Sequence, residues 1–424
     1  MLESKGEHFF LPNKLEVLVL PFPFFESVSI GLAVKAGVRF EDAAVNGISH
    51  FLEHLIFKGS RFYPHPLQIA TRIESLGGIV NAYTAEDHTL FWTKLGVEHW
   101  REGLKIILDA VFYPRLPREG IEVERKVILQ EIARRDDNPQ ELVWEAFAQA
   151  LWPQSNLGRS ILGPPEVIKH LQRDDFLQYR KKFYHPANMV LIVVGPLKAA
   201  AVAEWATDFL QEIPFQEERI EEKRTYRQKK PHLVIKNKST EQVHLVLGWR
   251  GLSLDSEQRY PASLLASILG RGMSSRLFRE IREKQGLVYT IYSSVEFFED
   301  TGFLAVYAGL APRNLKKGLR RILQEFEKVQ EEEVSADELA AAKEKIIGPF
   351  KFNLESTDGW MRYWAPRLLL QKKAEDPTTV IKKINQVTAK EIQSLARQLC
   401  RPQRLSLALV NDHCREDDIY RLLS

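Results

Sequence analysis

The sequence predicts an α+β protein of two similar domains, each an antiparallel sheet with helices packed on it. Three observations support this prediction. Hairpin-connected strand patterns alternate with long helical stretches, as is typical of helices layered on such a sheet. The same order of elements occurs twice in the 424 residues, which indicates an internal duplication. A charged segment bracketed by Pro214 and Pro231 separates the halves, so we expect domains at 1–213 and 232–424 joined by a linker at 214–231.

The N-terminal half begins with two runs of β-branched and aliphatic residues, at 15–20 and 27–36. Asn46-Gly47 then marks the start of a helix that runs to about Phe57. The elements expected after it are a helix at 67–76, strands at 79–85 and 89–95, helices at 99–113, 118–137 and 139–151, a buried strand at 188–195 and one more helix.

The C-terminal half repeats this order with little residue identity, so the duplication is inferred from the pattern of elements alone. The expected elements are strands at 233–237 and 242–250, helices at 258–269 and 275–284, strands at 287–295 and 302–309, helices at 313–330, 335–350 and 353–371, and a strand at 405–410.

The composition is that of an ordinary globular protein, with 44% hydrophobic and 27% charged residues. The net charge of +3 gives no reason to expect nucleic acid or an anionic membrane as a partner. No stretch approaches the roughly 18 apolar residues that span a bilayer, and the first residues lack an apolar secretory core. We therefore expect a cytoplasmic protein. Cys400 and Cys414 have neither zinc-knuckle nor redox spacing and are expected to be reduced.

The segment His50-Phe51-Leu52-Glu53-His54 contains candidate metal-binding and catalytic residues. Histidines at i and i+4 project from one face of a helix, which is the spacing that two imidazoles need to bind one zinc ion. Glu53 can reach the same site without being a ligand, and a carboxylate there suits a general base for the attacking water. The order His-x-x-Glu-His is the inverzincin signature. Because the neighbouring helix residues are apolar, these three polar side chains need partners, and a shared metal supplies them.

A catalytic zinc needs a third protein ligand and one open position. The helix expected at 118–137 offers Glu122, Glu124 and Glu131. Glu124 and Glu131 are seven residues apart and therefore lie on one face of that helix, two turns from each other. The helix pattern alone does not choose between these carboxylates.

These motifs resemble those of the pitrilysin-type metallopeptidases, in particular the short-chain branch of bacterial processing proteases and the mitochondrial processing peptidase. The resemblance covers essentially the whole chain, and its central match is GISHFLEHLIFKGS at 47–60. It implies that His50 and His54 bind zinc, one ion per chain, and that Glu53 is the base. All of these positions are present, so inactive relatives that lack them are a poorer match.

The resemblance also implies which carboxylate is the third zinc ligand and which Arg and Tyr of the C-terminal half contact the substrate. In the family, the third ligand lies in a motif similar to Val-Ile-Leu-x-Glu-Ile, which corresponds to residues 127–132 here. The resemblance therefore implies that Glu131 is the ligand and that Glu124 supports the site. An Arg and a Tyr seven residues apart hold the substrate and the developing oxyanion in the family. Arg282 and Tyr289 have that spacing.

A further match is the sequence at 77–84, GGIVNAYT, which resembles the family's edge strand beside the metal. A substrate peptide pairs with such an edge as an added strand, and the residues expected to bind it are Asn81, Ala82, Tyr83 and Thr84. Two departures concern turns. Arg271 stands within the Gly-rich turn at 270–272, and Asn13-Lys14 replaces the common Asn-Gly.

The resemblance therefore implies a zinc endopeptidase that cleaves unfolded peptides inside a closed chamber. A chain of this length carries both the zinc motif and the Arg282/Tyr289 pair, so we expect a homodimer, or a heterodimer with a related chain, in which one subunit completes the other's site. One alternative is a non-catalytic scaffold or partner subunit of an active peptidase. Another is a metal-dependent hydrolase of a non-peptide substrate, which the edge-strand motif argues against.

Overall fold

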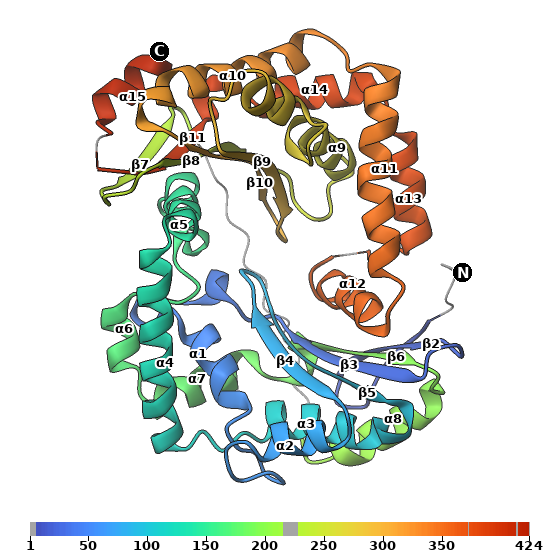
Figure 1. Ribbon diagram of the computed structural model, residues 1–424. Coiled ribbons are helices and arrows are strands. Elements are labelled where there is room, and N and C mark those ends of the chain that lie inside the picture. Colours follow the sequence, from blue (N-terminus) through green and yellow to red (C-terminus); the bar gives the residue numbers. More distant parts are fainter. Residues whose placement is uncertain (1–5, 215–227, 372, 413, 424) are drawn as a thin grey trace. The chain divides into compact units, whose positions relative to one another are not determined.

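The computed structural model describes residues 6–214, 228–371, 373–412 and 414–423. Most of the linker expected at 214–231 lies outside the described residues. The chain divides into two compact units, and each contains one sheet with helices packed on it (Figure 1). The α+β class and the two similar domains are thereby confirmed. None of the helices in the described ranges is long and apolar enough to cross a membrane.

The two sheets have the same topology apart from β1, an additional strand at one edge of the first sheet. In the first sheet the strand order is β1-β2-β6-β3-β5-β4, and in the second it is β7-β11-β8-β10-β9. The strands are β1 (Glu7–Phe10), β2 (Glu16–Pro21), β3 (Ser27–Val34), β4 (Ile79–Thr84), β5 (Thr89–Gly96), β6 (Met189–Gly195), β7 (His232–Lys236), β8 (Val243–Arg250), β9 (Thr290–Phe297), β10 (Gly302–Leu310) and β11 (Ser406–Val410).

Each sheet contains one parallel pair, β2 with β6 and β7 with β11, whereas all other pairs are antiparallel. The sequence analysis expected wholly antiparallel sheets. The difference arises because the two parallel partners are the first and last strands of the repeated five-strand pattern, so three other strands and several helices separate them in the chain and no hairpin joins them. The parallel pair occupies the same place in both sheets, which supports the internal duplication.

The helices fall largely where the sequence predicts them, except that α6, α7, α13, α14 and α15 were not expected. The helices are α1 (Ile48–Ile56), α2 (Gln68–Ser75), α3 (Trp100–Phe112), α4 (Arg118–Asp137), α5 (Pro139–Leu151), α6 (Pro165–His170), α7 (Arg173–Phe183), α8 (Ala199–Phe209), α9 (Arg259–Gly270), α10 (Leu315–Glu331), α11 (Ala336–Asn353), α12 (Thr357–Leu370), α13 (Pro377–Gln386), α14 (Ala389–Leu399) and α15 (Glu416–Leu423).

The two halves of the chain exchange a helix. Segment Ala133–Arg159, which holds α5, belongs to the second unit, and segment Phe352–Glu375, which holds α12, belongs to the first. Helix α5 packs on β7, β8 and β11, and α12 packs on β3 and β6 (Figure 1). Gly31 on β3 permits the close approach of α12, because a Cβ there would lie 2.6 Å from Sδ of Met361. The compact units therefore do not coincide with the two halves of the sequence.

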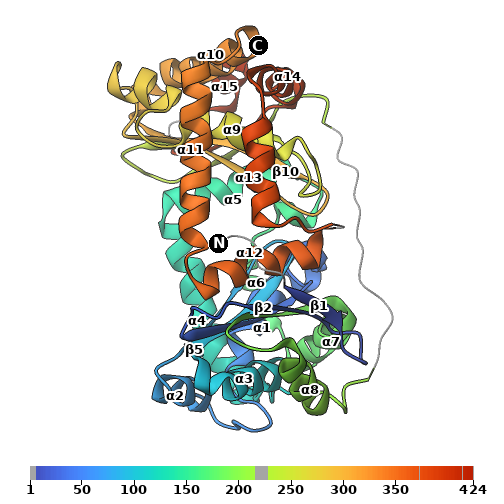
Figure 2. The ribbon, with the colours of Figure 1, turned by 90° about the vertical axis from the view of Figure 1, so that its right-hand side faces the viewer.

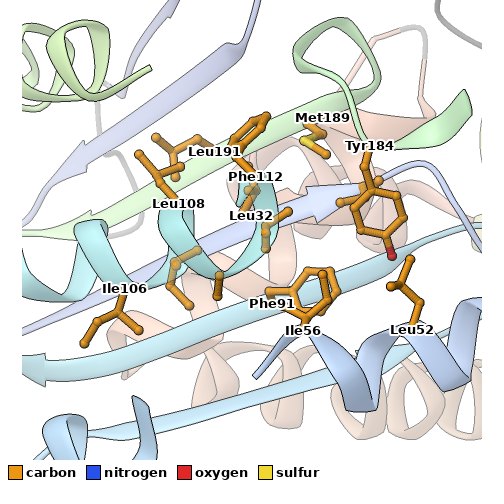
Figure 3. Packing of buried hydrophobic residues seen from close by; sticks show 14 of the residues in the cluster. Leu32, Leu52, Ile56, Phe91, Ile106, Leu108, Phe112, Tyr184, Met189 and Leu191 are labelled. Carbon is orange, nitrogen blue, oxygen red and sulfur yellow. The ribbon is translucent and has the colours of Figure 1, made fainter. Parts of the chain in front are cut away.

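The first sheet is covered on both faces. Helix α12 lies on one face, and α3 and α8 lie on the other (Figure 2). The core on the α3 side also receives α1, whose Ile56 lies beside Phe91 of β5 and whose Leu52 belongs to the same core as Leu108 of α3 (Figure 3). These side chains are fully buried. Because one face of α1 is fixed in this core, the position of its opposite face is fixed as well.

Candidate metal centre

Helix α1 presents His50, Glu53 and His54 on the side away from the core. The helix begins after Gly47, whose φ of +96° is a left-handed conformation that glycine adopts without strain. Its apolar positions are buried, whereas the two histidines and the glutamate are only half-buried. The two imidazole rings lie 4.7 Å apart between centroids, as the i, i+4 spacing predicts.

The start of α1 is anchored by a buried carboxylate that the sequence analysis had not singled out. Oε2 of Glu41 accepts hydrogen bonds from the Gly47 amide at 2.7 Å and from Nδ2 of Asn46 at 2.7 Å. Its Oε1 accepts one from the Ser49 amide at 2.9 Å. Burial raises the pKa of Glu41, although these hydrogen bonds oppose the shift. The carboxylate satisfies amides at the helix N-terminus and thereby fixes the first turn, which carries His50.

Three potential metal ligands converge between α1 and α4. Oε2 of Glu131 lies 3.7 Å from Nε2 of His50 and 3.8 Å from Nε2 of His54. Tetrahedral zinc with bonds of about 2.1 Å would hold its ligand atoms about 3.4 Å apart, so the donor set fits zinc after small side-chain movements. Among the described residues, no other group of three His, Cys, Asp or Glu side chains converges in this way.

The protonation of His50 also suits metal binding. Burial, followed by the charge of His54, lowers the pKa of His50 to about 4. The imidazole is therefore neutral at pH 7, and the neutral ring is the form that binds a metal.

Glu124 lies behind the histidines, one heptad before Glu131 on the same helix. It is 4% exposed. One oxygen lies 3.0 Å from Nδ1 of His54, and the other lies 2.7 Å from Nζ of Lys58. Burial alone would raise the pKa of Glu124, but the hydrogen bonds from Lys58 and His54 outweigh it and lower the pKa. An ionised Glu124 can accept the Nδ1–H of His54, which leaves Nε2 unprotonated and directed toward Glu131.

Glu53 occupies a separate position beside the three potential ligands. Its Oε2 accepts a hydrogen bond of 2.6 Å from the hydroxyl of Thr84, at the end of β4. Burial raises the pKa of Glu53, and the hydrogen bonds from Thr84 reduce that rise. A carboxylate with a raised pKa near a metal is suited to take up a proton during hydrolysis.

Strand β4 is at one edge of the first sheet, and within the described part of the chain it pairs only with β5. Alternation places Thr84 and Ala82 on the face toward α1, and Asn81 and Tyr83 on the opposite face. Oδ1 of Asn81 accepts the amide of Ala82 at 2.8 Å, and the hydroxyl of Tyr83 lies 3.2 Å from Nε2 of His88. The free edge of β4 therefore lies next to the carboxylate of Glu53, where an added peptide strand can pair.

Arg282 and Tyr289 belong to the second unit, whereas the three potential metal ligands belong to the first. Instead of the α-helix expected at 275–284, residues Phe278–Glu283 form a π-helix, a rare geometry that is frequent at functional sites. Tyr289 is 61% exposed and directly precedes β9, so the strand expected at 287–295 begins at Thr290. Its side chain is therefore accessible to a ligand.

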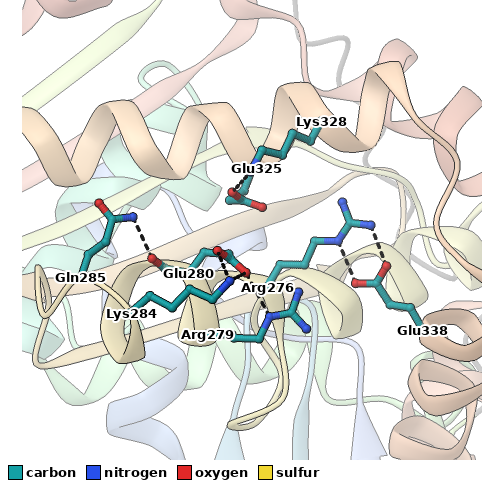
Figure 4. Close-up of polar contacts among 8 residues, drawn as sticks. All are labelled: Arg276, Arg279, Glu280, Lys284, Gln285, Glu325, Lys328 and Glu338. Carbon is teal, nitrogen blue, oxygen red and sulfur yellow. Dashed lines mark hydrogen bonds and ion pairs between the residues drawn. The ribbon is translucent and has the colours of Figure 1, made fainter.

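A network of charged side chains surrounds the π-helix (Figure 4). Glu280 accepts hydrogen bonds from Arg279 and from Lys284. Arg276 donates two hydrogen bonds, of 2.7 and 2.6 Å, to Glu338 of α11. These contacts connect the segment that carries Arg282 to a neighbouring helix of the second unit.

Two residues at the first unit's site were missed from the sequence, Glu41 and Lys58. An acidic residue shortly before an Asn-Gly helix start is a weak signal for the cap that Glu41 forms. Lys58 is one turn after His54, on the same side of the chain, and that spacing to a ligand is the only signal for its contact with Glu124.

Comparisons with known proteins identify the family of the chain. A family model described as Insulinase (Peptidase family M16) matches residues 19–165, and one described as Peptidase M16 inactive domain matches residues 170–346. The chain is 30% identical over 402 residues to the uncharacterized zinc protease YmxG of Bacillus subtilis. The matched region covers 94% of this chain and 96% of that relative. The chain is 36% identical over 340 residues to an uncharacterized zinc protease of Rickettsia bellii, covering 79% of this chain and 81% of that one.

Solved structures share the fold across the whole chain. A protease from Helicobacter pylori superimposes with a TM-score of 0.91 at 21% identity, covering 96% of this chain and 100% of that structure. A peptidase M16 inactive domain from Pseudomonas fluorescens gives 0.89 at 17% identity, covering 97% and 99%. These identities show the fold alone. Because relatives named zinc proteases match at 30% identity or more over most of both chains, the chain belongs to peptidase family M16, the pitrilysin-type family.

Proposed function

We propose that this protein is a zinc-dependent endopeptidase that hydrolyses peptide bonds of unfolded peptides. One observation carries the proposal. His50, His54 and Glu131 offer ligand atoms within 4.8 Å of one another, and Glu53 of α1 is hydrogen-bonded to Thr84 at the end of the edge strand β4. Three protein ligands with an adjacent carboxylate form the donor set of a catalytic zinc site, whereas structural zinc sites use four protein ligands.

The roles follow from the chemistry of each side chain. His50, His54 and Glu131 would hold one zinc ion, which, when bound, acidifies water and polarises a carbonyl. Glu53 accepts the proton of the attacking water and then donates it to the leaving amine. Glu124 holds the ring of His54 through Nδ1. By family resemblance, Arg282 and Tyr289 would stabilise the oxyanion that forms on the scissile carbonyl.

The substrate class follows from β4. A free strand edge recognises an extended backbone, so Asn81, Ala82, Tyr83 and Thr84 would align an unfolded peptide for attack. By family resemblance, we propose that the peptide is enclosed in a chamber and that a second subunit, a copy of this chain or a related one, completes each site with its Arg/Tyr pair.

The test is a digest of an unstructured peptide mixture, read by mass spectrometry with and without a chelator. We expect internal cleavages that disappear with the chelator and return with zinc. Glu53→Gln should retain about one zinc per chain but lose activity about 100-fold or more, because the amide cannot accept the proton. Glu74→Gln, an exposed carboxylate on α2, is the matched control. A zinc-loaded wild type that cleaves nothing would contradict the proposal and favour a non-catalytic partner subunit.

A further inference from the structure

Thr84 is the last residue of β4, and its hydroxyl is the hydrogen-bond donor to Glu53. The distance of 2.6 Å between Thr84 Oγ1 and Glu53 Oε2 is short, as is typical of a hydroxyl that donates to an ionised carboxylate. Among the described residues, Thr84 is the only one that donates a hydrogen bond to the Glu53 side chain. The contact joins residues 31 positions apart in the sequence.

The direction of this hydrogen bond is set by the carboxylate, which can only accept a hydrogen bond when it is ionised, and the neighbouring Thr89 does not compete for the Thr84 proton. The hydroxyl of Thr89 on β5 lies 2.8 Å from the carbonyl oxygen of Ala36, to which it donates its single proton. It also lies 3.5 Å from Oγ1 of Thr84, too far for a strong hydrogen bond. The Thr84 hydroxyl therefore keeps its own proton for Glu53. A β-branched side chain on a paired strand has few rotamers, so this donor is held in one direction.

The Thr84 hydroxyl binds Oε2 of Glu53. The Thr84 backbone also forms a hydrogen bond with this carboxylate, and a change of side chain leaves that backbone donor in place. Along the α1-facing side of β4, Thr84 follows Val80 and Ala82, two apolar residues that pack against the core. It is therefore the one polar side chain that this face of the strand directs at the site.

We propose that Thr84 is a positioning residue whose hydroxyl holds the Glu53 carboxylate in place and ties the base to the strand on which the peptide aligns. The proposal rests on the function proposed above. Its physical basis is that a general base acts only from a defined geometry, so that a displacement of about 1 Å costs about 100-fold in rate. A peptide paired with β4 and a base hydrogen-bonded to the same strand keep their relative position when the strand moves.

The first arm of the test measures kinetics and zinc content together. Thr84→Val removes the hydroxyl at nearly equal volume. We expect about one zinc per chain, a KM within about 3-fold of wild type and a kcat lowered about 10- to 100-fold. Thr84→Ser restores the donor and should recover most of kcat. The matched control is Thr93→Val on β5, which loses a 2.8 Å hydrogen bond to the carbonyl oxygen of Ile79 on the same strand pair.

The second arm needs no catalysis. In the zinc-free chain, a double-mutant cycle of Thr84→Val and Glu53→Ala should be non-additive by about fivefold or more in the unfolding equilibrium constant, whereas Thr93→Val and Glu53→Ala should be additive. An additive Thr84 cycle, or an unchanged kcat in Thr84→Val, overturns the proposal. If the wild type lacks peptidase activity but the Thr84 cycle is non-additive, the proposed function is refuted. The interaction between the Thr84 hydroxyl and the Glu53 carboxylate is then still supported.

Discussion

His54 has a carboxylate beside each ring nitrogen: Nδ1 lies 3.0 Å from Oε2 of Glu124, within hydrogen-bond distance, and Nε2 lies 3.8 Å from Oε2 of Glu131. The two carboxylates come from one helix, two turns apart, yet they contact opposite sides of the ring. One is suited to bind a metal beside the histidine, and the other is suited to orient the histidine. Their roles can be separated by mutation because each contacts a different nitrogen atom.

The first prediction compares these carboxylates. Glu131→Gln should lose zinc on dialysis, because a neutral amide is a poor ligand. Glu124→Gln should retain zinc better, with affinity lowered about 10- to 100-fold, because only the orientation of the His54 ring is weakened. Zinc is measured by atomic absorption after dialysis. If Glu124→Gln loses more zinc than Glu131→Gln, the two roles are exchanged.

The second prediction concerns Lys58. The Nζ atom of Lys58 lies 2.7 Å from Oε1 of Glu124, and the Glu124 side chain is almost fully buried. Lys58→Met keeps a side chain of similar length but removes the ammonium group. The pKa of Glu124 should therefore rise, and its hydrogen bond with Nδ1 of His54 should weaken. We expect a zinc affinity about 10-fold lower, measured by competition with a chromogenic chelator. Lys126→Met, an exposed position on α4, serves as the control, and equal affinities for both variants would exclude this role for Lys58.

The third prediction concerns pH. In the folded, zinc-free chain the pKa of His50 is about 4, below the value of about 6.5 in an unfolded chain. The unfolded state therefore binds more protons between these values, and the zinc-free protein should lose stability as the pH falls from about 6.5 toward 4. The upper limit for one such group is roughly 3 kcal/mol. His88, whose pKa burial also lowers to about 4, adds to this loss.

Urea unfolding of the zinc-free protein at pH 7 and pH 5 measures this effect. His50→Asn should reduce the loss of unfolding free energy between these pH values without abolishing it, because His88 remains. His65→Asn, at an exposed position on the same unit, should leave the loss unchanged. The same pH dependence in His50→Asn and wild type would show that His50 is not buried as a neutral ring.

Part of the site could be predicted because it depends on local geometry. The spacing of His50 and His54 determines that both rings lie on one face of a helix, and the heptad between Glu124 and Glu131 determines that both carboxylates share a face. Which of these carboxylates faces the Nε2 atoms depends on how α4 packs beside α1, and the helix pattern contains no such information.

The remaining contacts depend on tertiary structure. The cap that Glu41 forms and the hydrogen bond from Thr84 to Glu53 join residues whose sequence positions give no sign of contact. The sequence also did not predict that α5 belongs to the second unit and α12 to the first. An amphipathic helix pattern specifies a buried face but not the sheet that the helix covers. The elements missed at α6 and α13 are short and begin with proline, so their patterns resemble loops.

The last prediction tests whether two chains complete each other's site. Glu53→Gln and Tyr289→Phe should each be nearly inactive, since one removes the base and the other removes the proposed oxyanion partner. If the Arg/Tyr pair of one subunit serves the zinc of another, mixing the two variants under subunit exchange should restore activity. A mixed dimer has one intact site and one site with both lesions. Random pairing makes about half of the dimers mixed, so activity should recover to about a quarter of wild type.

Two controls give this experiment its meaning. Exchange is demonstrated independently, by mixing subunits that carry two different fluorophores and recording energy transfer. A mixture of Glu53→Gln with His50→Asn provides the matched negative control, because both lesions fall in the same half of the chain and no pairing restores an intact site. Recovery in the first mixture alone supports sharing between subunits. No recovery in spite of demonstrated exchange would mean that a site is completed within one chain or by a different protein.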